Sequence, residues 1–186
     1  MKAKQLFRFS MVALCAILMT GLTACGNKNN GNDPEVPDTK PAGAKMSFVV
    51  NFSAASLEIF DVTMEYIDAN GEKKSELVKD TKLDKQIYSK TLPAKFGFIM
   101  HIAEKEGLDR SKYEYMEMTY DFDFRSCVTN AAGEQITSAH PFTAGNSTKL
   151  AIGKIDTYLA SYKKNGEVNT IHMYDANGNF SESKWE

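Results

Sequence analysis

Apolar and polar residues alternate along several stretches of the chain, most clearly between residues 113 and 128. Every second position in the middle of this stretch is apolar: Met116, Met118, Tyr120, Phe122 and Phe124. The positions between them are polar or charged: Glu117, Thr119, Asp121, Asp123 and Arg125. Successive side chains of a strand point to opposite faces of its sheet, whereas a helix repeats about every 3.6 residues. The stretch is therefore predicted to be a strand with one buried face and one wet face.

The same alternation, together with turn residues, predicts the other strands. Asn70-Gly71, Asn165-Gly166 and Asn177-Gly178 are each flanked by strand-like residues. Asn-Gly tolerates the positive φ angles that tight hairpin turns need. With these turns as boundaries, strands are predicted at 46–53, 59–68, 73–79, 86–92, 95–104, 134–139, 155–163, 167–174 and 179–185. The last three are predicted to form a three-stranded meander.

The fold class follows from this series of strands. Nine or ten strands are expected, and no segment has the pattern of a long amphipathic helix. The prediction is an all-β domain built as an antiparallel β-sandwich, immunoglobulin-like or similar, with a closed barrel as the alternative. Residues 155–162 stand apart because both faces of the expected strand are partly apolar. Either sheet neighbours cover both faces, or the face with Tyr158 and Tyr162 meets a ligand or partner.

The first 24 residues have the parts of a secretory signal. Lys2, Lys4 and Arg8 precede an apolar run from Met11 to Met19, which is too short to cross a bilayer because a spanning helix needs about 20 residues. The motif Leu22-Thr23-Ala24-Cys25 follows and resembles the bacterial lipobox. The resemblance implies cleavage before Cys25 and a lipid anchor on that cysteine, with two or three acyl chains to hold the membrane firmly.

These features divide the chain into three predicted parts. Residues 1–24 are the signal peptide, residues 25–45 are the lipidated cysteine and a flexible tether, and residues 46–186 are a single β-sandwich domain. The tether is rich in Gly, Asn, Pro, Asp and Lys, so it has little to bury. The whole is similar to the small exported lipoproteins of Bacteroides-like bacteria. That resemblance implies an outer-membrane location, with the periplasmic and the surface face both open, and it implies no site residues.

Net charge limits the classes of binding partner, and cysteine content limits the possible sources of stability. The precursor has 22 basic and 24 acidic residues, and the first 24 residues hold three of the basic ones and no acid, which leaves a net charge near −5 after cleavage. A mildly acidic chain argues against nucleic acid as a partner. Cys127 is the one cysteine left beside the lipidated Cys25. No intrachain disulfide is expected, so the hydrophobic core has to supply the stability.

Metal and cofactor chemistry is not expected. His101, His140 and His172 are far apart in the sequence and lack the spacing of a metal site. Asp68-Ala69-Asn70-Gly71 and Asp175-Ala176-Asn177-Gly178 have part of a calcium-loop pattern, but the later ligands are missing. Both are interpreted as turns in which the aspartate side chain bonds nearby backbone amides. Cys127 is expected to be a partly buried, unreactive thiol.

Two candidate sites lie on the predicted strand at 113–128. Asp121 and Asp123 share a face at a spacing that a pair of glycosidase carboxylates could use, although the adjacent Arg125 indicates simple charge balance. Tyr113 and Tyr115 share the same predicted face with Glu117 and could form a glycan platform of aromatic rings beside a carboxylate.

The sequence therefore favours a lipid-anchored, non-enzymatic module of the cell envelope that binds a glycan or a protein partner. No catalytic residue is assigned in this interpretation. Two alternatives remain: a glycoside hydrolase that uses Asp121 and Asp123, and a purely structural envelope or pilus component.

Overall fold

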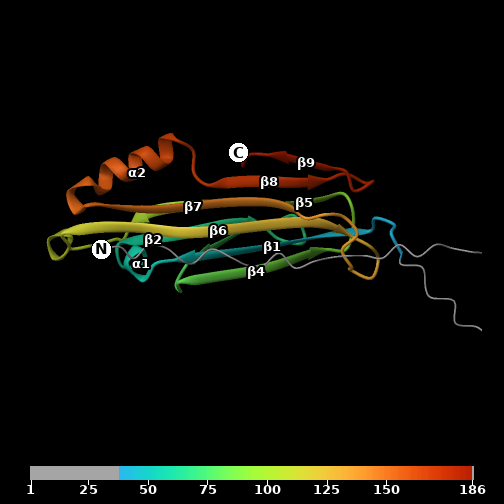
Figure 1. Cartoon of the computed structure of the whole chain (residues 1–186), viewed down its shortest axis with the longest axis horizontal. Helices are drawn as coiled ribbons and strands as arrows, with labels where there is room; N and C mark the ends of the chain where they lie inside the picture. Colours follow the sequence, from blue (N-terminus) through green and yellow to red (C-terminus); the bar gives the residue numbers. More distant parts are fainter. Residues whose placement is uncertain (1–37, 186) are drawn as a thin grey trace, which may run out of the picture. The chain divides into compact units, whose positions relative to one another are not determined.

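The computed structural model describes residues 38–185, which form two antiparallel sheets packed face to face (Figure 1). The four-stranded sheet has the order β4-β1-β6-β7, and the five-stranded sheet has the order β3-β2-β5-β8-β9. The strands are β1 (Gly43–Phe52), β2 (Phe60–Ile67), β3 (Lys73–Leu77), β4 (Lys82–Ser89), β5 (Ala94–Glu104), β6 (Tyr115–Thr129), β7 (His140–Ala151), β8 (Asn169–Tyr174) and β9 (Phe180–Ser183). The predicted all-β sandwich is confirmed, with nine strands among the described residues.

The core fills the space between the sheets with the side chains that the alternation assigned to it. Met116, Met118, Phe122 and Phe124 are fully buried, and Tyr120 is 8% exposed. The ring centroids of Phe98 on β5 and Phe122 on β6 are 4.1 Å apart, so the two sheets meet through aromatic side chains. Burial of large aromatic surfaces dominates the energetics of such a core.

The predicted strand at 155–163 was wrong, because the structure has helix α2 (Ile155–Lys164) there. Ile155, Tyr158, Leu159 and Tyr162 are spaced three or four residues apart, so a helix places them on one face, and all four belong to the core or pack against it. Gly166, with a φ of 84°, follows the last turn, so Asn165-Gly166 ends a helix instead of joining two strands. The predicted C-terminal meander is therefore a helix followed by the β8–β9 hairpin.

Two further boundaries differ from the prediction. Residues 134–139 form a loop with one isolated bridge, between Gln135 and Thr129, and the next strand is β7. β7 escaped prediction because several of its inward positions are polar or small, such as Asn146 and Thr148. β4 begins at Lys82, four residues before the predicted start of that strand.

The remaining helices are short. Helix α1 (Ala54–Ile59) begins after Ser53, whose side chain accepts a hydrogen bond from the Ser56 backbone amide. The 3-10 helices η1 (Arg110–Lys112) and η2 (Ile152–Lys154) flank β6 and β7. Within residues 38–185, no helix combines the length and the apolar composition that crossing a membrane requires.

The domain begins earlier than residue 46. Gly43 already pairs with Thr129 across β1 and β6, and the Ala42 amide donates to the Thr129 carbonyl at 2.9 Å. The predicted signal peptide, Cys25 and the tether up to residue 37 lie outside the described residues. The chain thus enters the domain at the end of β6 marked by Thr129, whereas Tyr115 and its β7 partner Ala151 mark the opposite end.

Candidate functional site

The predicted glycan platform is only partly assembled. Tyr115 is the first residue of β6 and 47% exposed, and Glu117 follows on the same face. Lys149 on β7 lies opposite Glu117, with its Nζ 5.0 Å from the centroid of the Tyr115 ring. Tyr113 lies before the strand, at the end of η1, and packs against the core. The three side chains therefore do not form one row on a strand.

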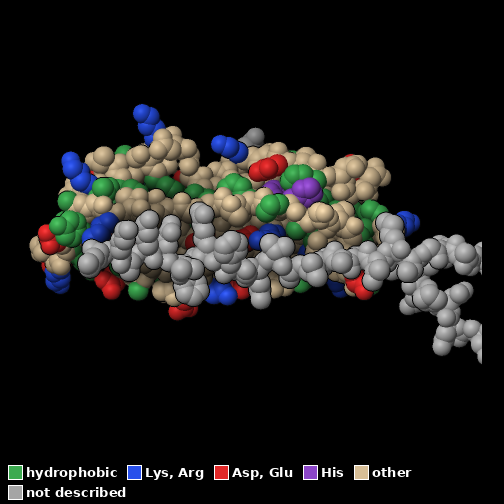
Figure 2. All heavy atoms as spheres, in the orientation of Figure 1, with side chains coloured by type: hydrophobic (Ala, Val, Ile, Leu, Met, Phe, Trp, Pro, Cys, Tyr) green, Lys and Arg blue, Asp and Glu red, His purple; other side chains and the backbone are tan. Residues whose placement is uncertain are grey.

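The two candidate carboxylates lie on the outer face of the four-stranded sheet. Asp121 is exposed, and Asp123 is bound by the Arg125 guanidinium through Nε and Nη2 at 2.8–3.1 Å. Asp123 is therefore held in an ion pair on the strand, the charge balance that the sequence indicated. Charged side chains of both signs are interspersed over the visible face of the molecule (Figure 2).

A serine–histidine pair lies between the sheets. The Ser126 hydroxyl is 2.7 Å from His172 Nδ1 and 2.7 Å from the Tyr174 hydroxyl. All three side chains are at most 1% exposed, so no substrate can reach them. Burial lowers the pKa of His172 to about 4. The trio is a satisfied polar network inside the core.

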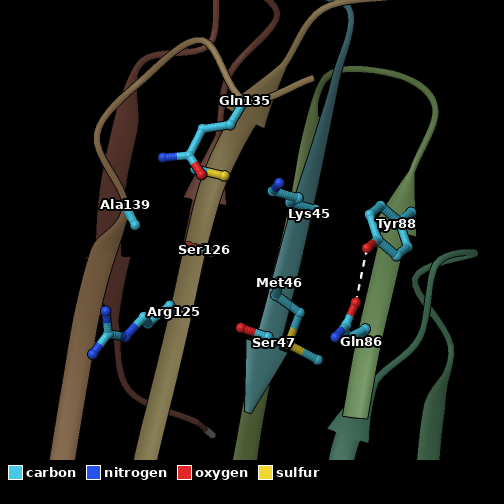
Figure 3. A pocket seen from close by; sticks show the side chains of 10 residues that line it. Lys45, Met46, Ser47, Gln86, Tyr88, Arg125, Ser126, Gln135 and Ala139 are labelled. Carbon is cyan, nitrogen blue, oxygen red and sulfur yellow. Dashed lines mark hydrogen bonds between the residues drawn. The ribbon is translucent and has the colours of Figure 1, made fainter. Parts of the chain in front are cut away.

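A depression lies on the outer face of the four-stranded sheet (Figure 3), and Cys127 is one of the residues that line it. Its lining includes Lys45, Tyr88 and Gln135, and its volume is about 430 Å³. The thiol is 2% exposed, and burial raises its pKa, with Lys45 opposing that shift weakly. A buried, protonated thiol is a poor nucleophile.

The two aspartate loops are turns. Asp68 Oδ1 accepts hydrogen bonds from the backbone amides of Asn70 and Glu72, and Asp175 Oδ1 accepts from those of Asn177 and Asn179. Both carboxylates are thus directed at their own backbone. Among the described residues, no group of three or more metal-ligating side chains is placed to hold an ion.

Another concave site lies between α2 and the inward face of β7, and we call it the tyrosine cleft. It exists because β8 pairs with β5 only as far as Ile99, so the five-stranded sheet lacks a strand beside the rest of β5. In Figure 1, α2 continues along the edge that β8 leaves open. The cleft has a volume of about 370 Å³, and its lining includes Tyr120, Asn146, Thr148, Tyr158, Tyr162 and Asn165.

Tyr162 lines the tyrosine cleft and is held in place by two hydrogen bonds. Its hydroxyl donates to the carbonyl oxygen of Met100 at 2.7 Å and accepts from the Val168 amide at 3.2 Å. The start of α2 is held as well, because Arg110 binds Asp156 at 2.8 and 3.0 Å and binds Glu104 of β5 through Nε at 2.6 Å. Contacts near both ends of helix α2 therefore hold it against the five-stranded sheet.

Tyr120 and Tyr158 present hydroxyl groups that have no hydrogen-bond partner within residues 38–185. Tyr120 is 8% exposed, and Tyr158 packs against Phe60 with ring centroids 6.0 Å apart. Burial raises the pKa of Tyr120 and brings that of Tyr158 to about 12. Both phenols are therefore neutral near pH 7 and can donate as well as accept.

The polar groups of β7 complete the tyrosine cleft. The Thr148 hydroxyl donates to Asn146 Oδ1 at 2.9 Å, and the Asn146 amide donates to the Met118 carbonyl. The residues that line the cleft in the described part of the chain include no Asp, Glu, Lys, Arg or His. Hydroxyls, amides and aromatic rings suit the binding of a small uncharged molecule better than acid–base chemistry.

Sequence reasoning found part of this site. The sequence left two alternatives for Tyr158 and Tyr162, a strand covered on both faces or a strand whose tyrosine face meets a ligand or partner, and it assigned Tyr120 to the core. The spacing of Ile155, Tyr158, Leu159 and Tyr162 was the signal that could have revealed the helix.

Comparisons with protein-family models, curated proteins and solved structures give no match to this chain. The candidate site is therefore assigned from its geometry.

Proposed function

We propose that this protein is a lipid-anchored, non-enzymatic binding module of the cell envelope. Lipid on Cys25 would attach it to the outer membrane, and the tyrosine cleft would receive its ligand. The lipobox-like Leu22-Thr23-Ala24-Cys25 supports the anchor. The observation that carries the binding function is Tyr120, a side chain that is 8% exposed and whose hydroxyl has no hydrogen-bond partner within residues 38–185 where it lines the cleft.

The position of the cleft supports this role. The chain enters the domain beside Thr129, and Tyr120 lies nine residues away along β6. At a strand rise of about 3.3 Å per residue, these two residues are on the order of 30 Å apart. A tether on Cys25 would thus attach at one end of the domain and leave the cleft in the half farther from that end.

The hydrolase alternative has less support. Asp121 and Asp123 lie on the outer face of the four-stranded sheet and outside the tyrosine cleft, and Asp123 is paired with Arg125. A glycosidase needs two carboxylates free to flank the bond that it cleaves. The ion pair with Arg125 engages one of the two here.

The experiment uses the full-length protein purified from membranes in mild detergent and coupled to a resin. Envelope polysaccharide and envelope protein extracts are passed over it separately. We expect one extract to leave a component on the resin and Tyr120→Phe to lose most of it, while Tyr88→Phe, on exposed β4, retains it. Retention that is equal in wild type and Tyr120→Phe would contradict the assignment. Release of sugar products that disappears with Asp121→Asn would favour the hydrolase.

A further inference from the structure

Tyr120 is a nearly buried side chain whose hydroxyl has no partner within residues 38–185. Buried polar groups are almost always hydrogen-bonded, because a missing partner costs free energy. Every fully buried side-chain nitrogen or oxygen in the described structure has a partner. The Tyr120 oxygen therefore keeps some contact with the cleft, where a ligand can reach it.

The side chains that line the tyrosine cleft indicate the class of ligand through their lack of charge. Side chains of the tyrosine cleft are tyrosine, asparagine, threonine, serine and valine, without an ionised group among the described residues that line it. Burial keeps the tyrosines neutral by raising the pKa of Tyr120 and Tyr158. A charged ligand would lose water there without gaining an opposite charge, which is unfavourable. The lining therefore favours an uncharged ligand.

The polar groups of the cleft match hydroxyl groups. The Tyr120 and Tyr158 phenols and the Thr148 hydroxyl each donate and accept, as sugar hydroxyls also do. The tyrosine rings supply apolar surface for the C–H face of a sugar ring. An extended peptide would be recognised mainly through backbone groups at a sheet edge, whereas the cleft offers side-chain groups. Its volume of about 370 Å³ is near the lower end for small-molecule sites.

We propose that the tyrosine cleft binds an uncharged sugar residue, such as a neutral hexose or N-acetylhexosamine at the end of a glycan, with the hydroxyls of Tyr120 and Tyr158 bonded to hydroxyls of the sugar. This inference rests on the proposed binding function and names its ligand. It replaces the strand platform of Tyr113, Tyr115 and Glu117 as the place where a glycan is held.

The test is saturation-transfer NMR titration of the full-length protein in detergent. The probes are the methyl glycosides of neutral hexoses and N-acetylhexosamines. Glucuronic acid is the charged control compound, and an uncharged, end-blocked serine–glycine tetrapeptide is the peptide control compound. We expect at least one neutral glycoside to bind and the two control compounds to give no signal. Tyr120→Phe should weaken binding roughly tenfold, the effect of one lost hydrogen bond in a desolvated site.

Two controls separate binding from folding. Tyr120→Phe should leave the melting temperature unchanged or slightly higher, because the hydroxyl that it removes has no partner within residues 38–185. Tyr88→Phe, an exposed change on β4, should leave both binding and melting unchanged. Absence of binding by every neutral glycoside, or equal binding by wild type and Tyr120→Phe, overturns the inference. If the peptide binds and Tyr120→Phe abolishes that binding, the sugar is the wrong ligand but the proposed binding function stands. If the resin experiment retains no envelope component, the proposed binding function itself is refuted.

Discussion

The Tyr162 hydroxyl donates a hydrogen bond of 2.7 Å to the carbonyl oxygen of Met100 and so ties helix α2 to the open edge of β5. The same oxygen accepts from the Val168 amide at the start of the segment that leads into β8. One side chain thus satisfies two backbone groups where the sheet lacks a neighbouring strand. Tyr120, which also lines the cleft, makes no such bond within residues 38–185. The two tyrosines should therefore respond differently to the same substitution.

Tyr162→Phe is expected to destabilise the domain by about 1–3 kcal/mol, because it leaves the Met100 carbonyl and the Val168 amide without their partner. Tyr120→Phe is expected to change the free energy of unfolding by less than about 0.5 kcal/mol. Urea denaturation of the two variants beside wild type measures both values. If Tyr120→Phe costs as much as Tyr162→Phe, the Tyr120 hydroxyl has a structural partner and the cleft assignment fails.

The register of β6 can be tested by comparing substitutions at two neighbouring residues. Phe122 is fully buried between the sheets, whereas Asp121 is exposed on the outer face. Phe122→Ala should cost about 3–5 kcal/mol through lost burial and the cavity it leaves, and Asp121→Ala should cost less than about 0.5 kcal/mol. Chemical denaturation again supplies the measurement. The reverse ranking would mean that the strand is shifted by one residue.

How far the sequence predicts this fold depends on which residues occupy the inward positions. β6 was recognisable because its inner positions are Met and Phe and its outer positions are charged. Helix α2 was not, because Ile155 and Leu159 fit a period of two as well as a period of about 3.6 over so short a stretch. β7 was missed because Asn146 and Thr148 point inward.

Two elements that the sequence did not predict, α2 and β7, are elements that form the tyrosine cleft. Asn146 and Thr148 point toward α2, so a packed core does not select apolar residues at those positions. Functional sites are the places where local pattern and fold are expected to disagree. Tyr120 could not be distinguished from core residues by sequence, because its difference is a missing hydrogen-bond partner, which only the three-dimensional arrangement reveals.

His172 should make stability depend on pH. Burial lowers its pKa from the ordinary 6.5 to about 4, although Glu182 and His140 act on it with opposite signs. Above pH 6.5 the imidazole is neutral in both states and its contribution to stability is complete. As the pH falls toward 4, the unfolded chain binds the proton first, so up to about 3 kcal/mol is lost.

Urea denaturation at several pH values between 7 and 4 measures this loss. The matched variant is His172→Gln, which removes the titrating group and keeps a polar side chain beside Ser126. It should be less stable at pH 7 but should show a shallower decline across the window. A decline as steep as that of wild type would mean that other groups, and not His172, cause the acid sensitivity.

The anchor prediction concerns a residue outside the described structure. Cys25→Ala should abolish incorporation of labelled fatty acid and leave uncleaved or unanchored protein, because the lipobox-like Leu22-Thr23-Ala24-Cys25 supplies the acylated cysteine. Metabolic labelling followed by membrane fractionation checks this. Cys127→Ala is the control and should keep its label, since that thiol is buried in the domain. Undiminished labelling of Cys25→Ala would exclude the lipid anchor at this position.

Tyrosine-selective NMR tests the central claim most directly, because the chain has eight tyrosines to serve as reporters. The full-length protein is labelled with ring-¹³C tyrosine, each resonance is assigned by single Tyr→Phe variants, and neutral methyl glycosides are added. If the tyrosine cleft holds the sugar, the Tyr120 and Tyr158 resonances shift with the same saturation curve while those of Tyr88 and Tyr115 stay in place. If Tyr115 shifts and Tyr120 does not, the sugar lies on the outer sheet face and the tyrosine cleft is not its site.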